Sequence, residues 1–122
     1  DIDISQIPDL APILGIVLSL SSGGGKLLNG ERLRYKESNR IEATIDLINA
    51  LGGEAKEVND DIVIRGFETL KGGRVCSFRD HRMVMAAAVA ALRCEEPVII
   101  EDYRAVSKSY PNFFKDLESI LK

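Results

Sequence analysis

The sequence predicts a mixed α/β fold (α/β or α+β in class) for a single domain. Three observations lead to this expectation. Apolar helical stretches alternate with short strand-like runs, glycine pairs or triplets separate them, and two neighbouring runs have the spacing of a β-hairpin. The 122 residues suffice for one compact domain and are too few for two. We therefore expect residues 1–122 to form one domain with mixed sheets.

The first predicted helix runs from residue 9 to about residue 21, directly after Pro8. It is apolar on nearly every side, so we expect it to be buried all round. Asp9 lies in its first turn, where a carboxylate suits the positive end of the helix dipole. The glycines at 23–25 end the helix, and residues 26–28 are predicted to form a short strand.

The second predicted helix starts between residues 36 and 39, after a cationic loop at 32–36. Its isoleucines at 41, 45 and 48 form a one-sided apolar stripe. Gly52 and Gly53 supply its C-terminal stop. Residues 54–58 and 61–65 then indicate a hairpin around Asn59-Asp60.

The last third of the chain repeats the alternation of strand and helix. A strand is expected at 74–78, and Asp80 can cap a third helix that continues to Leu92 and is apolar on most sides. Residues 97–101 form a short apolar strand. Pro111 is predicted to open an amphipathic last helix with apolar positions at 113, 114, 117, 120 and 121.

Charge and composition exclude several classes of partner. The net charge of −3 argues against nucleic acid as an electrostatic partner. The longest apolar run, 10–20, contains a proline and a glycine and is too short to span a membrane.

Because the chain begins at Asp1 and not at methionine, we expect it to be a segment of a longer polypeptide.

Cysteine and histidine usage points to a cytoplasmic protein without a structural metal. Cys76 and Cys94 have no metal-like spacing, and His81 is the one histidine in the sequence. No signal-peptide pattern is visible at the N-terminus. We expect two reduced, largely buried thiols.

Cations gather where three predicted helices begin. They are Arg34, Lys36 and Arg40 before the second helix, Arg79, His81 and Arg82 before the third, and Lys108 before the fourth. Cations at a helix N-terminus oppose the macrodipole, which favours anions there by roughly 0.3–1 kcal/mol each. A bound anion would remove the conflict, because N–H groups, dipoles and guanidinium groups would all face it. The pattern predicts a small ligand with several negative charges.

Each of these residues also has a simpler interpretation. Lys36 and Glu37 could be a solvated pair, and Asp80 could serve only as a helix cap. His81 could be a core histidine, and Asp9 could be a first-turn carboxylate without further duty. The glycine triplet before Lys26 lacks the spacing of a phosphate-binding loop and is a helix stop.

Four motifs together resemble the EPSP synthase family. They are Ile7-Pro8-Asp9, Arg34-Tyr35-Lys36-Glu37-Ser38-Asn39-Arg40, Asp80-His81-Arg82-Met83 and Lys108-Ser109-Tyr110-Pro111. Their order and spacing resemble the C-terminal half of the family enzymes over essentially the whole chain. No single motif would suffice, but the set is highly specific. Asn39 stands where the family commonly has aspartate, which is a neutral change beside the site.

The resemblance implies an inside-out fold. Family domains are built from repeated βαβαββ units, with helices inside and sheets facing solvent. Residues 1–122 would be the C-terminal part of the second of two domains. The first domain, absent here, would contribute several phosphate- and shikimate-binding groups. We therefore expect the fragment to be inactive alone, with uncovered helix surface that favours a dimer.

The resemblance also implies a reaction. The enolpyruvyl (carboxyvinyl) group of phosphoenolpyruvate would pass to the 5-hydroxyl of shikimate 3-phosphate, with release of phosphate, in the shikimate pathway to aromatic amino acids. No metal or organic cofactor is implied. Glyphosate, the family inhibitor, would use the same cationic groups as the substrates.

Residue roles follow from the resemblance, position by position. Asp9 would hold the shikimate ring hydroxyls and accept a proton from the attacking one, and Lys36 would lie near the same hydroxyl. Glu37 would transfer the proton at the methylene carbon, and His81 would support the site by hydrogen bonding.

Three further cations would bind the phosphoenolpyruvate. Arg40 and Arg82 would clamp its carboxylate, because guanidinium groups can make two parallel hydrogen bonds with one carboxylate. Lys108 would meet its phosphate.

Other readings remain open from the residues alone. A related enolpyruvyl transferase acting on a UDP-linked amino sugar shares the chemistry but matches the four motifs poorly. A binding module for a phosphorylated metabolite would use the same cations, but would have no use for Asp9 and Glu37 among them. A domain without any ligand leaves the three cationic helix starts unexplained.

Overall fold

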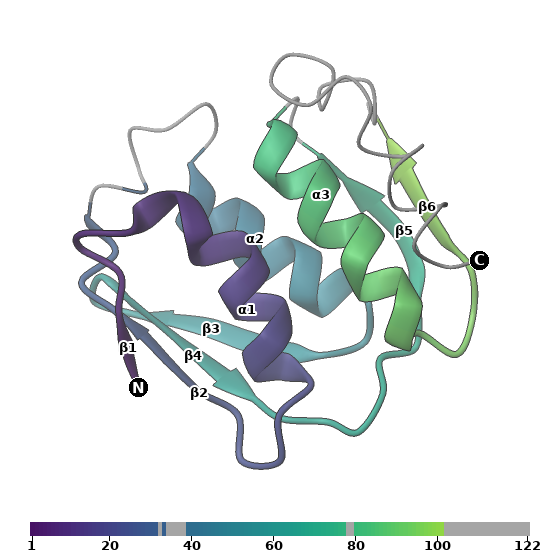
Figure 1. Cartoon of the computed structure of the whole chain (residues 1–122), viewed down its shortest axis with the longest axis horizontal. Coiled ribbons are helices and arrows are strands. Elements are labelled where there is room, and N and C mark those ends of the chain that lie inside the picture. The colour runs from purple at the N-terminus through teal and green to yellow at the C-terminus, as the bar shows by residue number, and fades with distance from the viewer. Residues whose placement is uncertain (32, 34–38, 78–79, 102–122) are drawn as a thin grey trace.

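The computed structural model of the chain describes residues 1–31, 33, 39–77 and 80–101. In this part of the chain three α-helices lie against two β-sheets, which confirms the mixed α/β class (Figure 1). None of the helices described is long and apolar enough to cross a bilayer.

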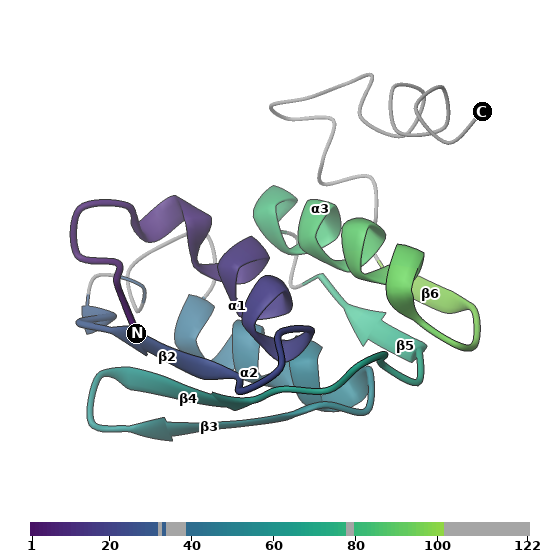
Figure 2. The same ribbon diagram turned by 60° about the horizontal axis from the view of Figure 1, so that its bottom comes forward.

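The first six α- and β-elements follow the order βαβαββ. They are β1 (Ile2–Asp3), α1 (Ala11–Ser19), β2 (Gly25–Leu28), α2 (Arg40–Ala50), β3 (Glu54–Val58) and β4 (Asp61–Arg65). Their strands form one sheet in the order β1-β2-β4-β3, in which β1 runs parallel to β2 and the other pairs are antiparallel (Figure 2). This is the unit that the family resemblance implies. Strand β1 was not predicted, because two residues are too few to show an alternating pattern.

A second, two-stranded sheet follows. Strand β5 (Gly73–Cys76) pairs in parallel with β6 (Val98–Glu101), with Gly73 opposite Val98. Helix α3 (His81–Ala90) and a 3-10 turn, Ala91–Arg93, connect the two strands. The predicted strands and helix are confirmed here, with ends shifted by one or two residues.

The N-terminal helix differs from its prediction. Residues Pro8–Leu10 form a 3-10 turn, and the α-helix begins only at Ala11 and ends at Ser19. The expectation of burial on all sides is wrong, because Leu10 is 41% and Val17 is 50% exposed. An apolar sequence favours burial, but within the described residues nothing covers this side of the helix.

Helix α2 and the hairpin agree with the sequence. Asn39 caps α2, with its side-chain oxygen accepting the N–H of Glu42 at 3.4 Å. In the hairpin Val58 lies opposite Asp61, so Asn59 and Asp60 form the loop. Asn59 has a φ of 57°, a left-handed value that asparagine tolerates better than most residues.

The core lies between the helices and the sheets. Helix α1 packs on β2 and β4, α2 on β3 and β5, and α3 on β6. Gly15 allows α1 to approach α2 closely, since a Cβ there would lie 3.0 Å from Thr44 Cγ2 and 3.2 Å from Ile48 Cδ1. This packing sets the positions of the helix N-termini relative to one another.

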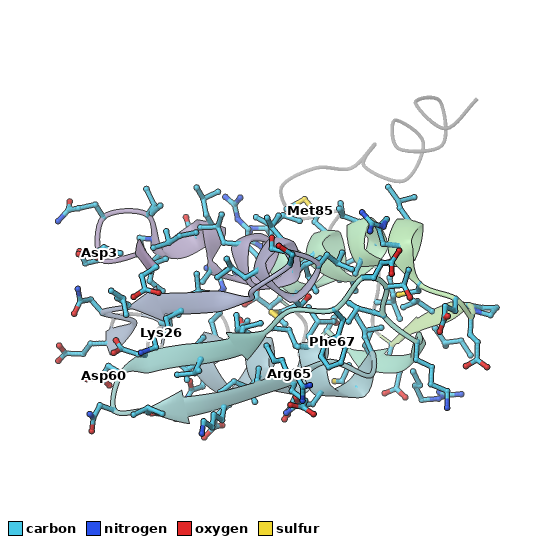
Figure 3. The ribbon with its side chains drawn as sticks, turned by 90° about the horizontal axis from the view of Figure 1, so that it is seen from below. Asp3, Lys26, Asp60, Arg65, Phe67 and Met85 are labelled. Carbon is cyan, nitrogen blue, oxygen red and sulfur yellow. The ribbon has the colours of Figure 1, made fainter. Side chains whose placement is uncertain are left out.

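The outer surface carries the polar side chains of the strands. On it Arg65 places its guanidinium 5.6 Å from the ring centroid of Phe67 (Figure 3). Cys76 is also exposed, whereas Cys94 is half-buried. The expected burial is therefore wrong for Cys76, because alternation along β5 turns Val75 inward and Cys76 outward.

Candidate functional site

Four charged side chains meet at the N-terminal ends of three elements. Arg40 is the first residue of α2, Asp80 is the N-cap of α3, Arg82 is the second residue of α3, and Asp9 lies in the 3-10 turn before α1. We call Asp9, Arg40, Asp80 and Arg82 the charged cluster. It brings together three of the four motifs described above.

The centre of the charged cluster is a buried ion pair. The Arg40 side chain is 2% exposed and that of Asp80 is 0% exposed. Arg40 Nε donates to Asp80 Oδ2 at 2.7 Å, and Arg40 Nη2 donates to Asp80 Oδ1 at 2.9 Å. Two parallel, charge-assisted bonds of this kind are the strongest arrangement available to an arginine and a carboxylate.

Asp80 also begins helix α3. Its Oδ1 accepts the backbone N–H of Arg82 at 3.0 Å. Its backbone carbonyl accepts the N–H groups of Met83 at 3.0 Å and Val84 at 3.2 Å. The predicted cap is confirmed, and the same carboxylate serves the helix and Arg40 together.

Asp9 lies between the two arginines. Its Oδ1 accepts Arg40 Nη1 at 2.9 Å, and its Oδ2 lies 3.8 Å from Arg82 Nη2. The Asp9 side chain is 52% exposed, so one end of the charged cluster is open to solvent. Two arginines and two aspartates balance in charge.

The pKa of Arg40 reflects this arrangement. Burial by itself would lower it, but the hydrogen bonds and charges of Asp80, and then of Asp9, outweigh burial and hold the pKa above its usual value. Arg40 is therefore a permanent cation. The two aspartates also relieve its conflict with the dipole of α2, a relief that the sequence alone attributed to a ligand.

A hollow of about 190 Å³ adjoins the open end of the charged cluster. Its polar side is formed by Asp9 and Arg82, and the remaining wall is apolar, formed by Leu10, Pro12, Ile13, Met85, Ala86 and Val89. The Arg82 side chain is 36% exposed. Its Nε atom is buried and has no hydrogen-bond partner among the described residues. Buried donors are normally satisfied, so this N–H is suited to an anionic ligand or a further protein group.

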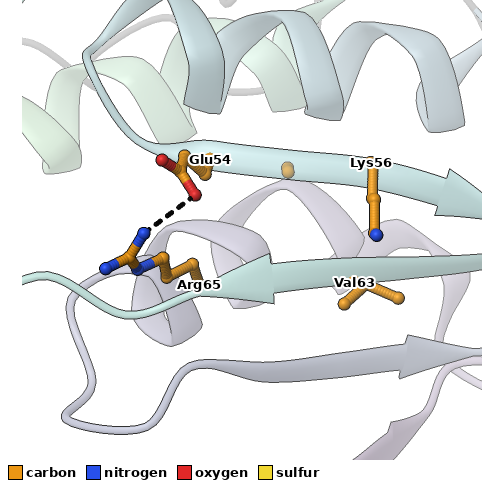
Figure 4. A pocket seen from close by; sticks show the side chains of 5 residues that line it. Glu54, Lys56, Val63 and Arg65 are labelled. Carbon is orange, nitrogen blue, oxygen red and sulfur yellow. Dashed lines mark hydrogen bonds and ion pairs between the residues drawn. The ribbon is translucent and has the colours of Figure 1, made fainter.

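A second hollow, of about 200 Å³, lies on the β3–β4 hairpin (Figure 4). Its charged pair, Arg65 and Glu54 at 3.4 Å, is 69% and 62% exposed. An exposed pair of this kind adds little to stability or binding. We therefore place the candidate site at the charged cluster.

The predicted site residues divide into two groups. Asp9, Arg40 and Arg82 lie together, and His81 follows Asp80 as the first residue of α3. Lys36, Glu37 and Lys108 lie outside the described residues, as do Arg34 and Arg79, so their roles stay predictions. From the sequence, Asp80 is predicted as a helix cap and as part of the Asp80-His81-Arg82-Met83 motif, without a site role of its own. No signal in the sequence marks Arg40 as buried, so its need for the Asp80 counter-charge became visible only in the structure.

Comparison with known proteins agrees with the motifs. Residues 1–117 match the family model described as EPSP synthase (3-phosphoshikimate 1-carboxyvinyltransferase). A 3-phosphoshikimate 1-carboxyvinyltransferase of Clostridium acetobutylicum is 52% identical over 119 residues, which cover 98% of this chain and 28% of that protein. The corresponding protein of Clostridium novyi is 47% identical over 119 residues, covering 98% of this chain and 27% of its own length.

The fold agrees as well. A solved structure of EPSP synthase from Acinetobacter baumannii matches with a TM-score of 0.85 and 27% identity, covering 95% of this chain and 28% of the other. The chain thus spans little more than a quarter of the length of these relatives. Over nearly its whole sequence, and in its arrangement of helices and strands, the chain belongs to the EPSP synthase family.

Proposed function

We propose that the chain is part of an enzyme that transfers the enolpyruvyl group of phosphoenolpyruvate to the 5-hydroxyl of shikimate 3-phosphate. The charged cluster carries this proposal. Asp9, Arg40 and Arg82 come from three separate family motifs, and Asp9 lies 2.9 Å from Arg40 and 3.8 Å from Arg82. The acceptor named in the relatives favours 3-phosphoshikimate over a UDP-linked amino sugar.

Arg82 and Arg40 would hold the carboxylate of phosphoenolpyruvate. Arg82 lines the hollow, and its buried Nε–H has no acceptor among the described residues. Arg40 donates three of its five N–H bonds to Asp80 and Asp9. A guanidinium group held in place, as that of Arg40 is, stabilises negative charge without reorganising during the reaction.

Asp9 would bind the acceptor substrate, shikimate 3-phosphate. Its carboxylate is half-exposed at the mouth of the hollow, where it can hold ring hydroxyls and take the proton of the attacking one. The hydroxyl oxygen would bond to the central carbon of phosphoenolpyruvate, while the methylene carbon gains a proton. Loss of one proton from the resulting methyl group and cleavage of the carbon–oxygen bond to phosphate would then complete the transfer.

The remaining roles rest on the motifs. Glu37 would give and later remove the proton at the methylene carbon, and Lys36 would lie near the attacking hydroxyl. Lys108 would bind the phosphate, and His81 would support the site by hydrogen bonding. No metal or organic cofactor takes part in this proposal.

The rest of the site would come from a part of the enzyme that this chain does not span. We place the chain in the C-terminal part of the second domain of a cytoplasmic two-domain enzyme. The first domain would close over the substrates from the other side. The exposed Leu10 and Val17 suit such a covering partner, or a second copy in a dimer of the fragment.

The test is a chimaera in which this chain replaces the matching 28% of the Clostridium acetobutylicum relative. We expect phosphate release that requires both phosphoenolpyruvate and shikimate 3-phosphate, and no release by the 122-residue chain alone. A folded chimaera that binds both compounds without releasing phosphate would favour the binding-module alternative. A folded chimaera that binds neither would contradict both.

A further inference from the structure

The Asp80 carboxylate accepts hydrogen bonds from both arginines of the charged cluster. Asp80 Oδ1 accepts from Arg40 Nη2 at 2.9 Å and from the backbone N–H of Arg82 at 3.0 Å. Asp80 Oδ2 accepts from Arg40 Nε at 2.7 Å. Resting on the function proposed above, we infer that Asp80 is a positioning residue that sets the two arginines at the distance and angle a substrate carboxylate requires.

The geometry of Arg40 supports this role. A guanidinium group is planar, so two parallel bonds to Asp80 through Nε and Nη2 fix the orientation of its plane. Nη1 is the guanidinium nitrogen that does not bond to Asp80, and it donates to Asp9 at 2.9 Å. The orientation of the Arg40 guanidinium is therefore determined from within the protein.

Helix α3 links the same carboxylate to Arg82. Because Asp80 caps the helix at the Arg82 N–H, it fixes the backbone position from which the Arg82 side chain extends towards the hollow. A displacement of Asp80 would move Arg40 and Arg82 relative to each other. Misplacement of binding groups by about 1 Å can cost roughly a hundredfold in rate.

Stability alone does not explain Asp80. Serine or asparagine caps a helix about as well as aspartate. Replacement of a buried ion pair by apolar residues of similar volume is often neutral or stabilising. Yet both Asp80 and Arg40 are almost fully buried as charged groups. Of the side chains that make good caps, only aspartate can also accept two parallel bonds from an arginine as an anion.

The test compares Asp80→Asn and Asp3→Asn in the chimaera described above. Asparagine can still accept the backbone N–H of Arg82, so the cap is retained. Its side-chain NH2 group is a donor, however, and would face the N–H donors of Arg40. We expect D80N to raise the KM for phosphoenolpyruvate at least tenfold and to leave the KM for shikimate 3-phosphate within twofold. D3N makes the same change at an exposed carboxylate on β1, which accepts the backbone N–H of Ser5 at 2.8 Å, and should leave both KM values unchanged.

The outcomes separate the two proposals. An inactive unsubstituted chimaera counts against the proposed function, whereas an active one with equal changes in both KM values, or none, overturns the role of Asp80. If D80N does not fold, the Arg40 Nε–H resonance of the unsubstituted chimaera decides. Slow exchange with water before phosphoenolpyruvate is added supports a preset guanidinium, and fast exchange overturns it.

Discussion

At the scale of single residues, Arg40 shows how the chain keeps a charge in its interior. Its side chain is 2% exposed, and its cost of desolvation is offset by two carboxylates at 2.7 to 2.9 Å. The sequence predicts Arg40 as a ligand-binding cation, and the structure adds that it ties α2 to α3 and to the 3-10 turn. Removal of such a residue leaves Asp80 as an uncompensated buried charge.

We therefore expect Arg40→Ala to lower the free energy of unfolding by about 3–5 kcal/mol. Arg65→Ala is the matched control, because the ion pair of Arg65 with Glu54 is exposed (Figure 4). It should cost at most about 1 kcal/mol. Urea unfolding of the chain followed by circular dichroism measures both, and equal losses would contradict a buried pair.

Arg82 is the arginine that reaches the hollow, so its removal should affect binding more than folding. In the chimaera, Arg82→Ala should weaken phosphoenolpyruvate binding at least tenfold and shikimate 3-phosphate binding much less. Isothermal titration with each compound measures the two affinities. Arg74→Ala, which breaks an exposed pair between Arg74 on β5 and Glu101 on β6, should change neither affinity. Equal weakening for both ligands would argue against a carboxylate clamp.

At the scale of elements, a tight contact joins the turn after α1 to the end of β4. Phe67 N–H donates to Ser19 O at 2.8 Å, and Gly24 has a φ of 64°. A Cβ on Gly66 would overlap the carbonyl oxygen of Ser21 and lie 2.6 Å from Gly24 N. Both neighbours are backbone atoms, so they cannot move aside without displacing the turn. Gly66 is thus required by a close approach of two chain segments.

Gly66→Ala should therefore lower the free energy of unfolding by about 1–3 kcal/mol, as overpacking usually does. Gly23→Ala provides the comparison within the same turn, since a Cβ there meets nothing within 4 Å. We expect that variant to lie within about 0.5 kcal/mol of the unsubstituted chain. Thermal unfolding of the two proteins side by side distinguishes them, and a neutral G66A would show that the contact is looser than described.

At the scale of the whole molecule, the two sheets are joined mainly through helices. Helix α2 lies against β3 of the larger sheet and β5 of the smaller one, while the strand ladders themselves remain separate (Figure 2). A two-stranded sheet is marginally stable unless something packs on it. The β5–β6 pair therefore depends on α2 and α3 for its order.

Hydrogen exchange should show this division. Amides in the β2–β4–β3 ladder should exchange with water more slowly than those paired between β5 and β6 in the isolated chain. Mass spectrometry of exchanged fragments would resolve the two sheets. Uniform protection across both would mean that they open as one unit.

Features that depend on neighbouring residues were predictable from the sequence. The hairpin occupies 54–58 and 61–65 as predicted, because its loop residues and alternating strands are close in the chain. The predicted cap, Asp80, accepts an N–H only two residues further along the chain. Family membership also follows from the sequence, since four motifs at fixed spacing are specific even when each alone is weak.

Features that depend on distant partners were decided by the tertiary structure. Arg40 and Asp80 are forty positions apart, and neither residue alone indicates that they share a buried ion pair. The exposure of Val17 likewise follows from what lies beside α1 and not from its apolar sequence. Local preferences determine where helices and strands form, whereas the packing of α1, α2 and α3 determines which charges meet and which apolar faces remain open.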